Sequence, residues 1–287
     1  MNRILAAPMV AVSTANARRL VRLVHEMPVL YTEMLVDKSF LGKWDAKTVV
    51  QIASNSAPDF LDACKRLYND FGYASFNLNC GCPSTKIACS ASSGAALMLN
   101  PELVSKIIMN AADSLPMCSF SLKCRTGIDY NDSFEFFKAF IAKIGPSDKI
   151  SIDVHARKAW LQGLSPKQNR TIPPINYDFV YKIASVFPCT SFSINGDIKC
   201  VSEIEHHLQS FSGNIMIGRS LYDNPMILYA LSLSLDKTPD QLKYQLINEK
   251  RVAVVKEYCR RKHLGTKPLE KFQFIGSIDG HILWHPS

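Results

Sequence analysis

The sequence predicts an α/β protein, a TIM (β/α)8 barrel with a small helical appendage at its C-terminal end. Eight short apolar runs, each followed by turn-forming or polar residues, alternate with helix-like segments. Eight parallel strands are the number that closes such a barrel, and 287 residues suffice for one plus a short extension. A doubly wound open sheet is the alternative fold that the same alternation allows.

The strands and helices can be placed from the pattern of apolar residues. The predicted strands cover residues 3–8, 29–34, 49–53, 75–79, 119–125, 150–156, 191–196 and 214–219. Helix-like segments lie between them at 16–27, 58–72, 101–113, 133–145, 177–187 and 202–211. In the second of these, Phe60, Cys64 and Leu67 recur at helical spacing and Gly72 gives a stop. Strands that alternate with helices predict parallel pairing through crossover connections.

The alternation stops after about residue 230. Residues 238–262 read as one or two charged helices, and the last stretch has no clear period. We therefore expect two domains, a barrel over residues 1–235 and a helical appendage over residues 236–287.

Composition narrows the class of protein. Hydrophobic residues make up 47% and charged residues 20%, which provides a large core and excludes a disordered chain. There is no apolar run long enough for a membrane span and no secretory signal, so we expect a cytoplasmic protein. Nine cysteines in so large a chain favour reduced thiols. A net charge of +8 suits a polyanion such as RNA, and a basic protein without such a partner is the alternative.

The ends of the predicted strands carry candidate functional residues, because a TIM barrel places its active site at the carboxyl ends of its strands. The last two strands end in INGDIK and IGRS, where Gly196, Gly218 and Arg219 suit a phosphate. A tight turn with a solvated arginine is the alternative. Lys123 ends another strand, and an anionic cofactor would offset the cost of burying its ammonium. His155 is either a site residue or a core histidine.

The stretch CGCPSTKIACSASSGAALM, residues 80–98, holds three cysteines. Only one residue separates Cys80 from Cys82, which is too close for a zinc hairpin, and no second pair follows. A disulfide between them would be strained. We therefore expect no metal here, and we expect Cys80 and Cys89 to be small packing residues.

Several longer motifs resemble a known family. They are APM (7–9), TEM (32–34), FNLNCGCPS (76–84), VHARKAWLQGLSPKQNRTIPP (154–174), SINGDIK (193–199) and IGRSLYDNP (217–225). Between about residues 5 and 235 the chain resembles the tRNA-dihydrouridine synthases, most closely their bacterial DusA-type branch. The resemblance implies an FMN-bearing TIM barrel that uses NADPH to reduce uridine in the tRNA D-loop, around positions 20 and 20a.

The resemblance also implies roles for individual residues. Cys82 matches the catalytic acid, which the Gly81–Cys82–Pro83 turn would aim into the barrel mouth. The FMN contacts fall on Pro8, Met9, Val10, Gln51, Lys123, His155, Asn195, Gly196, Asp197, Gly218 and Arg219. The tRNA contacts fall on Asn79, Lys86, Lys167 and Arg170. We expect a monomer without a metal ion.

Three features depart from the family pattern, and one of them is a helical appendage shorter than is usual in the family. Ala88 stands where the family has glutamine, and Ala11–Val12 replace an acidic-aromatic pair. These departures leave two alternatives to an active synthase. One is a catalytically impaired flavin- or RNA-binding relic, and the other is a different FMN-dependent TIM-barrel reductase of a small pyrimidine.

Overall fold

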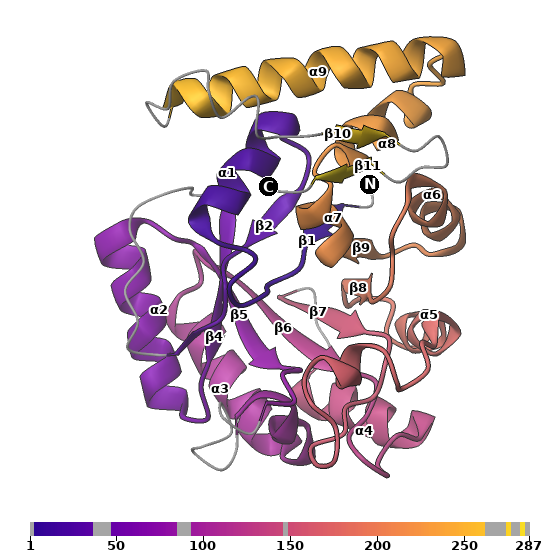
Figure 1. Cartoon of the computed structure of the whole chain (residues 1–287). Coiled ribbons are helices and arrows are strands. Elements are labelled where there is room, and N and C mark those ends of the chain that lie inside the picture. The colour runs from indigo at the N-terminus through magenta and orange to yellow at the C-terminus, as the bar shows by residue number, and fades with distance from the viewer. Residues whose placement is uncertain are drawn as a thin grey trace.

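The computed structural model describes residues 3–36, 47–84, 93–145, 149–261, 274–276 and 282–284. Eight parallel strands form a closed ring, because β2 pairs with β1 on one side and with β4 on the other (Figure 1). The strands of the ring are β1 (Ile4–Ala6), β2 (Val29–Tyr31), β4 (Thr48–Ala53), β5 (Ser75–Cys80), β6 (Ser119–Arg125), β7 (Ile150–His155), β8 (Phe192–Asn195) and β9 (Asn214–Ile217). The predicted TIM barrel is confirmed, and the open sheet is excluded.

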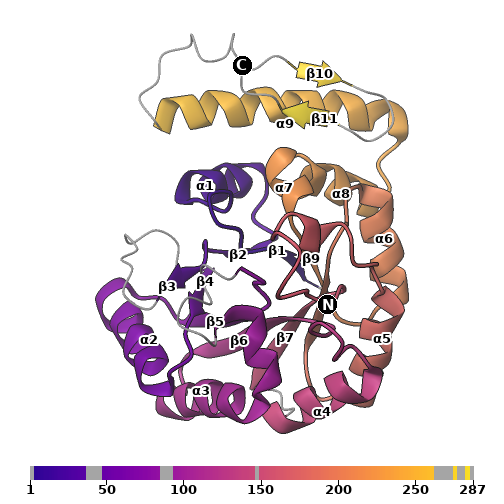
Figure 2. The same cartoon turned by 60° about the horizontal axis from the view of Figure 1, so that its bottom comes forward.

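The six predicted helices are present and surround the barrel (Figure 2). They are α1 (Ala15–Val24), α2 (Ala57–Phe71), α3 (Pro101–Ser114), α4 (Phe134–Ile144), α5 (Tyr177–Val186) and α6 (Val201–Ser210). Their ends follow local chemistry. The Asn100 side chain accepts a hydrogen bond from the backbone N–H of Leu103 at 3.1 Å and so caps α3 ahead of Pro101. Gly72 ends α2 in the left-handed conformation.

Some short elements were not predicted. They are the strand β3 (Leu35–Val36), the 3-10 helices Gly94–Leu99 and Gln168–Arg170, and the helices α7 (Arg219–Asp223) and α8 (Ile227–Leu235). The last two follow β9 and carry the chain from the barrel rim toward the C-terminal helix. The predicted end of the alternation, near residue 230, therefore falls inside α8.

The two faces of each strand have different chemistry. Side chains that face the helices, such as Phe76, Leu78 and Ile152, are buried in the main apolar core. Inside the ring, Leu5, Val49 and Met216 belong to a second, smaller apolar cluster on the β1, β2, β4 and β9 side. The opposite side of the interior, on β4 to β8, is lined by buried polar residues, namely Gln51, Asn77, Asn79, Ser121, Asp153, Ser193 and Asn195.

The C-terminal part begins with one charged helix, α9 (Asp240–Arg261), which lies against α1 and α8 (Figure 1). Val254 of α9 is buried in a cluster with Val24 and Met226, and Leu20 and Tyr229 pack around it. Farther on, β10 (Phe274–Gly276) and β11 (Ile282–Trp284) form an antiparallel pair. No helix among the described residues is long and apolar enough to cross a membrane. The division at residue 235 stays a prediction.

Candidate active site

The predicted residues converge at the carboxyl ends of the strands. A Cβ added to Gly218 would lie 3.8 Å from Sδ of Met9, so the ends of β9 and β1 are adjacent. In neighbouring strands His155 stands opposite Asn195, and Asn79 stands opposite Lys123. Residues from most of the ring therefore surround one opening, as the strand-end argument predicts.

Lys123 is a partly buried cation held by a neutral partner. Its Nζ donates a hydrogen bond of 3.0 Å to Oδ1 of Asn195, and Nδ2 of Asn195 donates to the carbonyl of Met216 at 2.8 Å. Burial, reinforced by the nearby charge of Arg125, lowers the pKa of Lys123 to about 8. The ammonium therefore stands in a setting that favours a bound anion.

His155 lies against the loop after β8. Gly196 has a φ of +121°, and a Cβ there would lie only 2.8 Å from Cδ2 of His155. Burial, with the surrounding charges of Arg125, Lys123, Arg157 and Arg170, holds the pKa of His155 well below its usual value. The ring is therefore neutral at physiological pH, and the space around it is strongly positive.

Asp197 joins two arginines at the rim next to Gly196. Its carboxylate pairs with Arg157 and, at 3.4 Å, with Arg219. The backbone of Asp197 has a left-handed φ of 48°. Since this carboxylate only accepts hydrogen bonds and is already paired, any contact of Asp197 with an anion has to come from its backbone N–H.

The turn that carries Cys82 is fixed from several sides. The Asn79 side-chain oxygen accepts hydrogen bonds from the backbone N–H of Gly81 at 3.1 Å and of Cys82 at 3.0 Å. Nε of Arg125 donates to the carbonyl of Gly81 at 3.2 Å. The carbonyl of Cys82 accepts from the N–H of Ala95 at 2.8 Å. This turn holds the thiol at a defined place at the barrel mouth.

Cys82 is a partly exposed, free thiol. Burial raises its pKa, while the backbone hydrogen bond from Ser84 and the positive charges of Arg125, Arg170 and Lys123 act in the opposite direction. Because the raised value prevails, the thiol keeps its proton at neutral pH. The sulfur is therefore suited to donate a proton rather than to attack as a thiolate.

The neighbouring cysteine behaves as predicted, since Cys80 is fully buried and free. Cys89 lies outside the described residues. Within the described part of the chain there is no group of three or more His, Cys, Asp or Glu residues suited to a metal ion. The expectation that no metal binds stays a prediction.

A chain of side-chain amides runs from Cys82 into the barrel. Nδ2 of Asn79 donates to Oε1 of Gln51 at 2.9 Å. Nε2 of Gln51 donates to Oδ1 of Asn77 at 2.8 Å, and Nδ2 of Asn77 donates to Oδ2 of Asp153 at 3.4 Å. The predicted residues Gln51 and Asn79 are thus two members of one buried network.

Two of the candidate tRNA contacts lie on the loop after β7, whereas Asn79 lies on β5. Lys167 and Arg170 are exposed, and the buried Asn169 between them bonds to Trp160 through both its oxygen and its nitrogen. Arg125 also donates to the carbonyl of Asn169 at 2.9 Å, which ties this loop to the Cys82 turn. Lys86 lies outside the described residues.

The first strand contributes a more open part of the rim. Pro8 and Met9 are partly buried, whereas Val10 is 61% exposed. The N–H of Ala11, beyond them, donates to Glu33 at 2.6 Å. Glu33 therefore fixes this loop from the end of β2.

Sequence reasoning did not assign a role to four residues of this region. Arg125 and Arg157 supply positive charge and brace two loops, and Asn77 and Asp153 continue the amide chain. Polar residues at alternate positions of otherwise apolar strands, as in SFNLNC, were the available signal.

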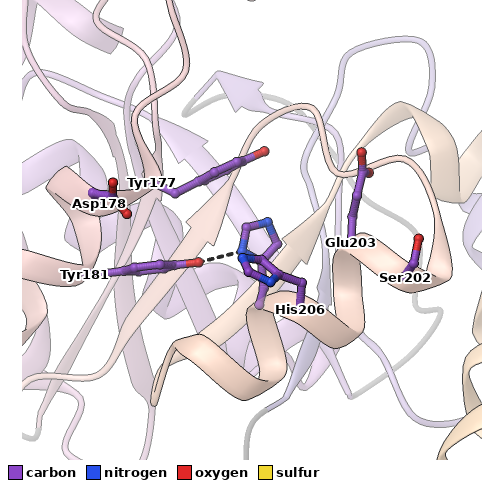
Figure 3. Close-up of a pocket in the computed structure, with 7 residues that line it drawn as sticks. Tyr177, Asp178, Tyr181, Ser202, Glu203 and His206 are labelled. Atoms are coloured by element: carbon purple, nitrogen blue, oxygen red, sulfur yellow. Dashed lines mark hydrogen bonds between the residues drawn. The ribbon is translucent and has the colours of Figure 1, made fainter.

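A separate hollow of about 360 Å³ lies outside the barrel between α5 and α6. Figure 3 shows the residues that line it, with the Tyr181 hydroxyl directed at a histidine ring. Nδ1 of His207 is 2.5 Å from that hydroxyl, and the Tyr177 hydroxyl donates to the carbonyl of Gly196. The hollow touches the loop after β8 through Tyr177 on its helix side, and none of the strand-end residues lines it.

Comparison with known proteins identifies the family. The family model described as dihydrouridine synthase (Dus) matches residues 4–277. The chain belongs to the dihydrouridine synthase family. The match continues past residue 235, the limit of the resemblance seen in the motifs, and so includes most of the C-terminal part of this family member.

Individual relatives agree with this assignment. A tRNA-dihydrouridine(20/20a) synthase from Vibrio cholerae is 36% identical and covers 98% of this chain and 89% of its own. Relatives of the same name from Haemophilus ducreyi and Escherichia coli K12 are 40% and 36% identical, over 79% and 98% of this chain and 71% and 81% of their own. The resemblance to the DusA-type branch is therefore confirmed.

The structure search agrees on the fold. A crystal structure described as TcOYE with pHBA superposes with a TM-score of 0.57, covering 81% of this chain and 89% of its own at 9% identity. At so low an identity the likeness concerns the fold alone.

Proposed function

We propose that this protein is an FMN- and NADPH-dependent tRNA-dihydrouridine synthase that reduces the C5=C6 bond of D-loop uridine, around positions 20 and 20a. The observation that supports the reaction best is the Cys82 turn, which Asn79 holds at the barrel opening near Arg125, Arg170 and Lys123, and burial raises the pKa of the thiol there. The curated relatives, which are named for this reaction at these positions, support the substrate.

The residues at the strand ends fit FMN. Gly196, whose Cβ would clash with His155, marks a place where the backbone can approach a ligand closely. Together with Gly218 and Arg219 it would hold the phosphate. Lys123 would lie near the flavin ring, where its positive charge stabilises the reduced, anionic form. The polar edge of the flavin ring would be bound by Gln51, Asn195 and His155. The opposite edge of the ring would be contacted by Pro8, Met9 and Val10.

FMN reduced by NADPH supplies a hydride, which suits C6 of uracil because the C5=C6 bond is conjugated to the C4 carbonyl. The protein then has to provide a proton at C5. Cys82 is the donor in this proposal, since its raised pKa keeps the S–H intact until charge develops on the base. One S–H bond breaks and one C–H bond forms, and the thiolate that remains is stabilised by Arg125, Arg170 and Lys123.

Asn79 would hold the target base next to Cys82. Its oxygen is already engaged with the Cys82 turn, so the base has to bind at its amide nitrogen. Nδ2 of Asn79 donates to Gln51 and, at 3.2 Å, to the sulfur of Met34. Sulfur is a weak acceptor, and a uracil carbonyl would therefore replace Met34 at a gain in hydrogen-bond strength.

The uridine has to leave its stack to reach this opening, so a flipped-out nucleotide is required. Lys167 and Arg170 would bind the neighbouring phosphates from the exposed loop after β7. The basic balance of the chain supports such contacts, and Lys86 would add to them. In this proposal residues 236–287 form a tRNA-binding appendage, and the enzyme acts in the cytoplasm as a monomer.

The test is to incubate the purified protein with NADPH and unmodified tRNA and to measure dihydrouridine by mass spectrometry of the digested RNA. We expect product in the D-loop and yellow protein that contains FMN. Flavin-loaded protein that binds tRNA without forming product would favour the relic. Equal rates on free uracil and on tRNA would favour a reductase of small pyrimidines.

A further inference from the structure

The proposed reaction gives no role to Asp153, a carboxylate buried inside the barrel with 1% of its surface exposed. Asp153 lies on β7, in register with Lys123 on one side and Ser193 on the other. An ionised group in such a place is costly unless it is hydrogen-bonded. Its contacts therefore indicate what it does.

Oδ2 of Asp153 accepts two hydrogen bonds. The Tyr31 hydroxyl donates at 2.8 Å from the far side of the ring, and Nδ2 of Asn77 donates at 3.4 Å. Burial raises the pKa of Asp153, whereas the hydrogen bond from Tyr31 and the charge of Lys123 lower it, and Oδ1 of Asp153 has no hydrogen-bond partner among the described residues. Asp153 in turn raises the pKa of Lys123 against the effect of burial.

The chain of amides that starts at Asp153 has a single direction. Asn77 turns its NH2 group to the Ser121 hydroxyl, at 2.8 Å, and to the carboxylate, at 3.4 Å, and its oxygen to Gln51. Gln51 in turn directs its oxygen to Asn79, and Asn79 directs its oxygen to the N–H of Cys82. The carboxylate of Asp153 can only accept hydrogen bonds, and the backbone N–H of Cys82 can only donate one. Both ends of the chain therefore require the same orientation of the three side-chain amides between them.

We propose that Asp153 is a positioning residue of the site, which fixes the orientation of Asn77, Gln51 and Asn79 and thereby the place of the Cys82 turn. The proposal rests on the proposed function, because it assigns Asp153 to the step in which Asn79 binds the uracil base and Cys82 donates its proton to it. Aligned hydrogen bonds strengthen one another, so a charged acceptor at one end stiffens the whole chain. Asp153 itself touches neither the base nor the thiol.

The variant that tests this is Asp153→Asn, which keeps the shape and removes the charge. We expect the kcat for tRNA reduction to fall about tenfold, while flavin content and the rate of flavin reduction by NADPH stay within about twofold. We also expect Cys82 to react about threefold faster with iodoacetamide, measured by peptide mass spectrometry, because a loosened turn exposes its thiol.

Thr48→Val is the control for a buried substitution in the barrel wall, since the Thr48 side chain lies on the helix-facing side of β4, away from the amide chain, and its hydroxyl has no hydrogen-bond partner among the described residues. Tyr31→Phe is the second variant, which keeps the carboxylate and removes its shortest hydrogen bond. We expect Thr48→Val to behave as wild type, and Tyr31→Phe to change both kcat and the alkylation rate by about threefold, in the same direction as Asp153→Asn.

Thermal unfolding establishes which variants are folded, and Tyr31→Phe decides the outcome should Asp153→Asn not fold. The proposal is overturned when a folded variant has both kcat and alkylation rate within twofold of Thr48→Val. A wild-type protein that makes no dihydrouridine refutes the proposed function instead. The alkylation rates, which need no turnover, then still decide the role of Asp153.

Discussion

Replacing Gly196 by alanine tests the proposed cofactor loop through a contact that the structure defines. The φ of +121° at this position is one that residues with a Cβ rarely adopt, at a cost of about 1–3 kcal/mol. The new methyl group would also lie 2.6 Å from Cδ1 of Ile175 and 2.8 Å from Cδ2 of His155. Overpacking of this kind adds about 1–3 kcal/mol, which gives a total loss of about 2–6 kcal/mol.

Gly72→Ala is the matched control for backbone strain. Gly72 also has a positive φ, of 75°, but a Cβ there would meet nothing within 4 Å in the described part of the chain. The control should therefore lose about 1–2 kcal/mol only. The larger loss expected for Gly196→Ala, measured by urea unfolding without cofactor, reports the clash of the new methyl group with Ile175 and His155.

The same pair of variants tests cofactor binding. A displaced His155 and a distorted loop should weaken FMN binding by at least about tenfold in Gly196→Ala, measured by quenching of flavin fluorescence. Gly72→Ala should bind FMN as wild type. Equal FMN affinity in the two variants would refute the placement of FMN against Gly196 and His155.

Three further predictions follow from the charges and the packing at the rim. Burial lowers the pKa of Lys123 to about 8 in the folded protein, against 10.5 for an ordinary lysine. Between these two pH values the Lys123 side chain binds a proton in the unfolded chain but not in the folded one. The cofactor-free protein should therefore become more stable as the pH rises through this range. FMN binding should weaken over the same pH range, because Lys123 loses its charge. A Lys123→Met variant, titrated in parallel, should show neither the gain in stability nor the loss of FMN affinity. Identical pH profiles of the two proteins would contradict the role of Lys123 as a buried cation that binds FMN. Arg170→Ala should reduce the salt dependence of tRNA binding, which is the slope of log K against log salt concentration in filter-binding assays, by about one unit. Lys65→Ala, an exposed substitution on α2, should leave this slope unchanged. A Cβ at Gly94 would lie 2.6 Å from the carbonyl oxygen of Cys82 and would displace the Cys82 turn. Gly94→Ala should therefore slow tRNA reduction at least about tenfold at normal FMN content. An unchanged rate would show that the position of the Cys82 turn does not limit the reaction.

The sequence predicted the barrel well because its strands are buried on the helix side and end at turn-forming residues. The run SFSLKCR coincides with β6, and the other seven runs overlap their strands within a few residues. Helix α8 was missed for a physical reason. Its sequence, ILYALSLSL, is largely apolar and packs on several sides, so it lacks the period that marks a surface helix.

The site was predicted in part. Lys123, His155 and Gly196 were found because they end strands, and the strand ends of a barrel meet at one rim. Asp153 was missed because its importance depends on Tyr31 and Asn77, which belong to two other strands. Which residues of separate strands meet inside a ring depends on its closure and register, and neither is visible in a local pattern.

The most direct test of the central claim is a single-turnover experiment on Cys82. Wild-type protein and Cys82→Ala, both loaded with FMN and reduced by one equivalent of NADPH, are mixed with excess unmodified tRNA without oxygen. We predict that the wild type forms dihydrouridine as its flavin is reoxidised, and that Cys82→Ala, with FMN and tRNA bound normally, does so at least about 100-fold more slowly. Equal rates in the two proteins would show that the proton comes from elsewhere and would contradict the account.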